Sequence, residues 1–190
     1  MFRDVFWTPV EDIGLEHLQL TEDRAGVAAE STVIGTHDGK PFRILYQVDC
    51  DRSWRTRRVH VATLGGHSQS MTLRADGDGT WIDEQGSELS VLERAIDVDI
   101  SATPFTNTLP VRRLDLSEGE ATELTVTYVS VPDLGLDADV QRYTCLEPVD
   151  ETGGRYQYDA VGSDFSAELE VDADGLVVEY TGLFTQSDPP

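Results

Sequence analysis

Apolar and polar residues alternate along most of this chain, and this alternation limits it to a fold built from β-strands. Successive side chains of a strand point to opposite faces, so a repeat of two gives each strand one apolar and one polar face. Every second residue of Arg43–Cys50 is apolar, and Phe165–Val171 alternates throughout. The stretches Asp76–Gly79 and Asp172–Gly175 carry the Asp and Gly residues of tight turns. The pattern therefore predicts hairpins of antiparallel strands.

The spacing of these signals predicts the fold class. We expect about ten strands with turns roughly every 8–12 residues, as in a sandwich or barrel. Helical patterning is nearly absent, so at most one short helix is expected, beginning after Pro110, because proline suits a first helical position. No repeat, linker or low-complexity segment divides the sequence. We predict a single all-β domain over residues 1–190, with residues 186–190 as a frayed tail.

The chain is strongly acidic, with 36 Asp and Glu residues against 14 Lys and Arg and a formal net charge of −22. Only Lys40 is a lysine, and the carboxylates are spread along the whole sequence. Concentrated salt screens the self-repulsion of such a surface, so we expect a halophilic source. Because phosphate groups are bound by basic surfaces, neither nucleic acids nor anionic membrane surfaces are expected partners.

The ends and the cysteines indicate an unexported protein. Met1–Trp7 lacks the long apolar region of a signal peptide, and no later apolar run could span a bilayer. We therefore predict a cytoplasmic location and no transmembrane segment. Cys50 and Cys145 are far apart in the sequence, and isolated cysteines of this kind are usually reduced core residues.

Motifs of the common catalytic classes are missing. The four histidines, His17, His37, His60 and His67, do not have the spacing of a metal site. The sequence contains no nucleophile elbow, P-loop or dinucleotide fingerprint. No metal and no cofactor are therefore expected, and a non-enzymatic role is favoured without excluding an enzyme.

The segment Thr103–Leu114 interrupts the alternation. Pro104 and Pro110 lack backbone N–H groups and favour extended geometry before them, so no ordinary helix or central strand is expected here. An aromatic ring, hydroxyls and an amide lie between them, and Arg112 and Arg113 follow. Two interpretations stay open. The segment is either a rigid plug that buries its apolar residues at one end of the sheet or a ligand site on a loop.

A second group combines arginines and aspartates. If a strand starts near Trp54, Arg55 and Arg57 point to its apolar face. Arginines placed there need carboxylates or an anionic ligand, and Asp97 and Asp99, on one face of a short strand, are candidate partners. The alternatives are internal salt bridges, a ligand site, or an acid–base pair beside an arginine clamp.

Pieces spread over nearly the whole chain match one protein family. They are Trp7, Gly14–Glu16, Tyr46–Arg57, Gly79–Trp81, Asp97–Leu114, Tyr128–Pro132, Gln141–Tyr143, Tyr156–Tyr158 and Asp172–Tyr180. By these residues the chain resembles the Putative glycolipid-binding family. The resemblance implies a single strongly curved antiparallel sheet that forms a partly open barrel around an apolar cavity, similar to bacterial lipoprotein carriers. In the family a Gly-Cys pair commonly precedes the Asp-Val-Asp piece. Arg94–Ile96 stands there instead, so no role for that cysteine carries over.

The resemblance and the candidate residues together predict non-enzymatic binding of an amphipathic, glycolipid-like ligand in the concave cavity of the sheet. The predicted ligand-binding residues are Trp54, Arg55, Arg57, Asp97, Asp99, Thr106, Asn107, Arg112, Arg113 and Tyr128. In this interpretation arginines meet the head group, and hydroxyl and amide groups bond its hydroxyls. One alternative is an enzyme acting on a sugar or phosphate ester through Asp97 or Asp99. Another is a structural or interaction module with a filled interior. The oligomeric state stays open.

Overall fold

The computed structural model describes residues 1–66 and 68–187, so His67 and the predicted tail residues 188–190 lie outside the described part. The strands are β1 (Phe2–Pro9), β2 (Gly14–Glu22), β3 (Val27–His37), β4 (Lys40–Cys50), β5 (Thr56–Thr63), β6 (Ser70–Ala75), β7 (Trp81–Ile82), β8 (Asp97–Ile100), β9 (Ala121–Ser130), β10 (Gly135–Asp150), β11 (Gly153–Ala160), β12 (Ser166–Val171), β13 (Val177–Tyr180) and β14 (Phe184–Ser187). The helical segments are η1 (Ser90–Leu92), η2 (Phe105–Asn107) and α1 (Thr108–Leu114). Gln186 and Ser187, at the start of the predicted tail, belong to β14 and pair with β1.

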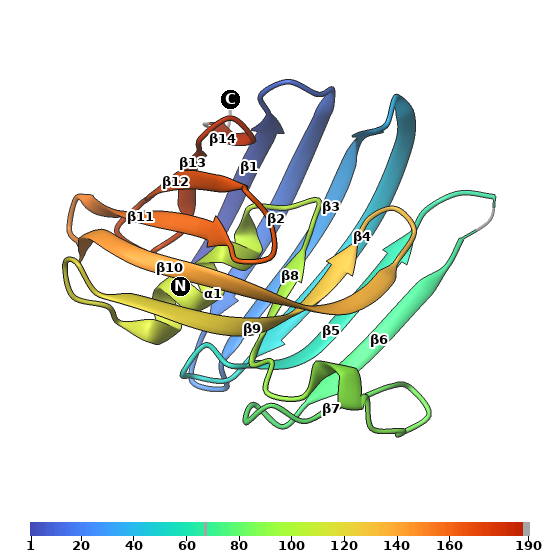
Figure 1. The fold of residues 1–190 in the computed structure, drawn as a ribbon. Coiled ribbons are helices and arrows are strands. Elements are labelled where there is room, and N and C mark those ends of the chain that lie inside the picture. Colours follow the sequence, from blue (N-terminus) through green and yellow to red (C-terminus); the bar gives the residue numbers. More distant parts are fainter. Residues whose placement is uncertain (67, 188–190) are drawn as a thin grey trace.

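All the strands belong to one 14-stranded sheet, ordered β7-β6-β5-β4-β3-β2-β1-β14-β13-β12-β11-β10-β9-β8 (Figure 1). Two meanders, β1–β7 and β9–β14, meet where β1 pairs with β14. The prediction of a purely antiparallel sheet of about ten strands was wrong, because β8 adds to β9 in parallel. The barrel was wrong as well. The edge strands β7 and β8 stand at opposite ends of the order, and the sheet is neither closed nor strongly curled.

The local signals of the sequence explain the hairpins. β12 alternates between exposed and buried residues along its whole length, as its sequence pattern predicts. In the turn that follows, the Gly175 N–H donates to the Asp172 carbonyl at 2.9 Å, and the Asp172 carboxylate accepts from the Leu176 N–H at 3.0 Å. Gly175 adopts a φ of +77°, which glycine reaches without steric cost. The predicted hairpin is confirmed.

The two meanders pack on each other through the core. In Figure 1, β9 and β10 cross in front of the strands of the first meander. One apolar cluster joins inward residues of β1–β5 to those of β8 and β9, and a second lies on β10–β13. The Trp7 indole N–H donates to the Val177 carbonyl at 2.7 Å and ties the first meander to the second. Cys50 and Cys145 are both buried and form no disulfide bond, as predicted.

Phe105–Asn107 and Thr108–Leu114 are helical, so most of the interrupting segment is not a loop. The expected short helix is present, but it begins at Thr108, before Pro110 rather than after it. Pro110 is the third residue of α1, where the N–H group it lacks would have no partner inside the helix. Phe105 and Leu109 are fully buried in the first core cluster, and Val111 belongs to the second. The segment therefore fills the space between the two meanders, as the plug interpretation expects.

Candidate functional site

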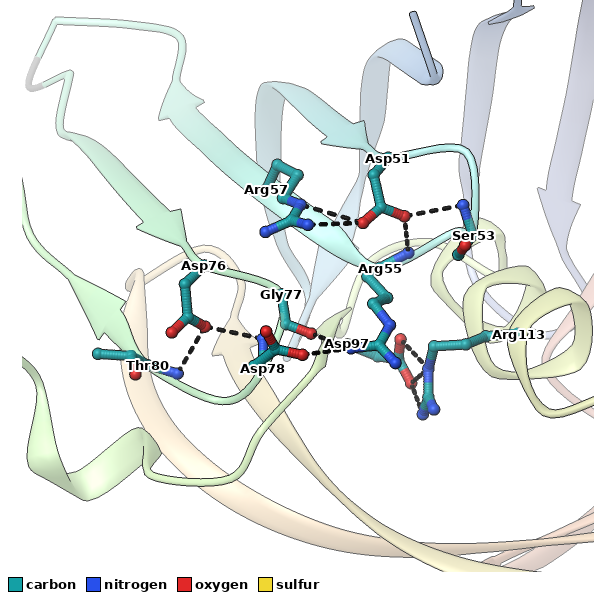
Figure 2. Close-up of polar contacts among 10 residues, drawn as sticks. All are labelled: Asp51, Ser53, Arg55, Arg57, Asp76, Gly77, Asp78, Thr80, Asp97 and Arg113. Carbon is teal, nitrogen blue, oxygen red and sulfur yellow. Dashed lines mark hydrogen bonds and ion pairs between the residues drawn. The ribbon is translucent and has the colours of Figure 1, made fainter. Parts of the chain in front are cut away.

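The predicted Arg–Asp group is a set of contacts within the protein (Figure 2). Asp97 is fully buried in β8, and Arg113 of α1 reaches it with two nitrogens. The Arg113 Nη2–Asp97 Oδ2 distance is 2.7 Å and the Nε–Oδ1 distance is 3.0 Å. Burial raises the pKa of Asp97, and the Arg113 guanidinium opposes this shift. The ion pair fastens α1 to the edge strand β8.

Asp99 lies on the same side of β8 and has neutral partners. Its carboxylate accepts from the Thr106 hydroxyl at 3.0 Å and from the Gln141 amide at 2.7 Å. Burial raises the pKa of Asp99, while the two donors lower it. These bonds connect β8 to η2 and β10.

Arg55 and Arg57 do not project from an apolar strand face as expected. A bulge in β5 pairs Cys50 with Thr56 and Asp49 with Arg58, so Thr56 is buried and Arg57 is displaced outward. Arg57 bonds Asp51 at 2.8 Å, and Arg55 bonds Asp78 at 2.5 Å (Figure 2). Their partners are therefore turn residues, and neither forms the predicted ion pair with Asp97 or Asp99.

The remaining predicted residues of this group are also in contact with protein groups. The Tyr143 hydroxyl donates to the Asn107 side-chain oxygen at 2.7 Å. The Arg112 guanidinium lies 4.8 Å from the ring centroid of Trp54 and donates to the Asp174 carbonyl. Such stacking is favourable because the ring face is electron-rich. Of the ten predicted residues, only Tyr128 lines the cavity described next.

A cavity of about 310 Å³ opens at the end of the sheet where β1 joins β2 and β3 joins β4. Its inner wall includes Trp7 of β1 and Val33 of β3, both buried. Ser101 and Ala102, which follow β8, and Tyr128 of β9 close it from the second meander. The cavity therefore lies between the two halves of the sheet.

Two glycines on neighbouring strands line this cavity. Gly14 of β2 is paired with Gly35 of β3, and Gly35 is paired with Phe42 of β4. These neighbours are two residues along from the inward-facing Glu16, Val33 and Ile44, so they share the inner face. A Cβ atom on Gly35 would lie 3.1 Å from the Phe42 ring. The Phe42 ring therefore covers Gly35, and the Pro9 ring lies against Gly14, where a Cβ atom would be 3.0 Å from it.

Glu16 is the one buried carboxyl group in the described wall of this cavity. Its Oε1 atom accepts bonds from three hydroxyls, those of Tyr46 at 2.5 Å, Ser31 at 2.8 Å and Thr103 at 2.9 Å. Its Oε2 atom is buried and has no partner among the described residues. Thr103, the first residue of the interrupting segment, therefore links that segment to β2 and β4.

The surroundings of Glu16 shift its acidity. No cation is paired with it in the described part of the chain, so burial raises its pKa to about 7 against the opposing effect of the three hydroxyl donors. Burial and the nearby Glu16 carboxyl raise the pKa of the Tyr46 phenol well above its usual value. A carboxyl group that titrates near neutral pH beside a cavity is typical of a functional site.

Sequence reasoning missed Glu16, although a signal for it was present. In β2 a repeat of two places Glu16 on the same face as Leu18 and Leu20, which form the core. A carboxyl group on an otherwise apolar strand face is costly unless it has partners or a role. The sequence could not show that Ser31 and Thr103 donate hydrogen bonds to Glu16, because Thr103 is distant from it along the chain.

The described residues contain neither a metal-binding cluster nor a helix suited to span a bilayer. No group of three or more His, Cys, Asp and Glu side chains is placed there to hold a metal ion. None of the helices over 1–66 and 68–187 has the length and apolar character needed to cross a bilayer.

The chain is similar to one protein family and to proteins of known structure. A family model described as Putative glycolipid-binding matches residues 4–186. The chain is similar to a DUF1089 family protein from Pseudomonas aeruginosa, known from a crystal structure, with 36% identity, a TM-score of 0.80 and coverage of 90% of this chain and 91% of that chain. It shares the fold of a beta-barrel-like DUF1849 protein from Brucella abortus, with 6% identity, a TM-score of 0.50 and coverage of 97% and 96%. None of the curated proteins matches the sequence.

Proposed function

The chain belongs to the Putative glycolipid-binding family, and from that premise we propose that it binds one amphipathic, glycolipid-like molecule in the cavity between the two meanders without converting it chemically. The observation that carries the proposal is the cavity itself, which combines apolar walls with a few polar groups. Small-molecule sites in proteins commonly have this composition.

The size of the cavity limits the ligand. A volume of about 310 Å³ is at the small end of the range for small-molecule sites, which is about 300–1,000 Å³. We therefore propose a ligand with a single chain or a single sugar ring inside the cavity, rather than a lipid with two enclosed chains.

Apolar side chains continue outward from the cavity. Ile13, Ile34 and Leu183 line it and are 82%, 46% and 38% exposed. Exposed apolar residues that adjoin a cavity are typical of a binding surface. A tail that leaves the cavity would cover them, and each CH₂ group removed from water contributes about 0.8 kcal/mol.

The alternatives receive less support from the geometry. An enzyme that uses Asp97 or Asp99 needs a carboxylate open to substrate, whereas Asp97 is held by Arg113 and neither aspartate lines the cavity. A purely structural module needs no cavity. Head-group binding by Arg55, Arg57, Arg112 and Arg113 was expected from the sequence. Their bonds to protein groups do not test it, and none of the four lines the cavity, so it is not part of this proposal.

Filling the cavity tests the proposal. Ala102→Phe places a ring in the wall, and Ala28→Phe on the outer face of β3 is the matched control. Native mass spectrometry and lipid extraction of the purified protein should detect a bound amphiphile in the wild type. Calorimetric titration with octyl glucoside should show affinity lowered at least about tenfold in Ala102→Phe only, a loss of about 1.4 kcal/mol. Absence of any bound amphiphile in the wild type, in both experiments, would contradict the proposal.

A further inference from the structure

We propose that the cavity selects an amphiphile whose head group is uncharged and bears hydroxyls, that it rejects anionic head groups, and that the buried carboxyl of Glu16 makes this distinction. The inference rests on the proposed function and adds to it the chemical class of the ligand. It replaces the expectation from the sequence that arginines bind the head group.

The charges around the cavity carry the first step. The carboxyl and imidazole side chains that line it are Asp12, Glu16, His37 and Asp133, and no described Arg or Lys joins them. Glu16 is 2% exposed and belongs to the inner wall, while the other three are exposed at the mouth. Like charges brought together in a binding site oppose binding, and buried charges are screened least by salt. An anionic head group would therefore meet repulsion inside and at the mouth.

The bonding of Glu16 carries the second step. Oε1 already accepts three hydroxyl donors, whereas Oε2 is buried beside the cavity and has no partner among the described residues, so Oε2 keeps the bonding capacity that a ligand group moving against it would use. A neutral Glu16 carries its proton on Oε2 and donates it, whereas an ionised Glu16 accepts there. A ligand hydroxyl both donates and accepts, so it satisfies Oε2 in either state. A sulfate ester only accepts, so it cannot satisfy the ionised state and repels it.

Titration of Glu16 gives the selectivity a pH dependence. The groups that face its carboxyl from the neighbouring elements, Ser31 of β3, Tyr46 of β4 and Thr103 after β8, are uncharged hydroxyls. Burial raises the pKa of Glu16 to about 7, so the ionised form predominates at pH 8 and the neutral form at pH 6. Discrimination against an anion should therefore be stronger at pH 8.

Three probes with the same chain test the proposal by calorimetry below their micelle-forming concentrations: octyl glucoside, octyl sulfate and octyltrimethylammonium. At pH 8 the wild type should bind octyl glucoside at least about tenfold more tightly than octyl sulfate. Glu16→Gln keeps the shape of the side chain and its acceptor oxygen, and it should reduce that ratio at least about threefold. The wild type at pH 6 should show a similar reduction, which Glu16→Gln should lack.

Controls separate this inference from the function on which it depends. Glu30→Gln makes the same change of charge on the outer face of β3 and should leave the ratio unchanged. Equal affinity of the wild type for octyl sulfate and octyl glucoside would overturn the inference, as would an unaltered ratio in folded Glu16→Gln. Tighter binding of octyltrimethylammonium than of octyl glucoside would also overturn it. Failure of all three probes to bind would instead contradict the proposed function.

Discussion

One carboxyl oxygen of Glu16 accepts three hydroxyl donors, and the other has no partner within residues 1–66 and 68–187, so the two protonation states of Glu16 differ in their cost to the fold. The unfolded chain releases this proton near pH 4.5, whereas the folded protein holds it until about pH 7. Between these values the folded state binds more protons, so stability falls as the pH rises. Below pH 4.5 the penalty is absent, and above pH 7 it is complete.

We therefore predict that the wild type loses stability relative to Glu16→Gln between pH 5 and pH 8. The separation between 4.5 and about 7 corresponds to about 3 kcal/mol in total. Urea unfolding at several pH values measures it, with Glu30→Gln as a control whose difference from the wild type should stay constant. A constant difference for Glu16→Gln would show that the Glu16 carboxyl titrates normally.

Substitution of Arg113 distinguishes a structural role of its ion pair with Asp97 from a ligand-binding role. Arg113→Ala leaves the buried Asp97 carboxylate without its cation, which should cost about 3–5 kcal/mol. Arg155→Ala, at an exposed pair with Glu147, should cost far less, because solvent screens that pair. Urea unfolding compares the two, and octyl glucoside affinity should be unaffected in a folded Arg113 variant. A small cost with a large loss of affinity would make Arg113 a ligand-binding residue.

At the scale of elements, stability should vary strongly across the sheet. β3 and β4 have bonded neighbours on both sides, and their inward residues are buried. β7 has only two residues and stands at an edge. Native-state hydrogen exchange should therefore protect amides of β3 and β4 by several orders of magnitude more than those of β7. Equal protection across these strands would contradict the assignment.

The elements also show which features sequence reasoning could reach. β4, β9 and β12 and the hairpin turns follow from alternation and from Asp and Gly residues, which act locally. The parallel pairing of β8 with β9, the bulge at Arg57 and the helical course of Phe105–Leu114 depend on distant partners. The cavity could not be predicted from the sequence for the same reason, because Ala102, Gly14 and Phe42 come together around it only in the folded chain.

For the whole molecule, the net charge of −22 sets the response to salt. The Debye length falls from about 10 Å at 0.1 M to about 3 Å at 1 M, so repulsion between carboxylates weakens. We predict that the melting temperature rises between 0.1 M and 2 M KCl. A variant with the exposed residues Asp38, Glu84 and Glu151 changed to amides should show a smaller rise. An unchanged melting temperature would remove the support for a halophilic source.

The junction of the two meanders orders the assembly of the molecule. Pro9 pairs with Phe184 across the boundary between β1 and β14, and both residues line the cavity. β1 and β2 are neighbours in sequence and can pair early, whereas contacts between segments far apart along the chain form slowly. The cavity is therefore completed only when the sequence-distant strands meet. A molecule bound there stabilises the finished protein but not a chain in which β1 and β14 have yet to pair.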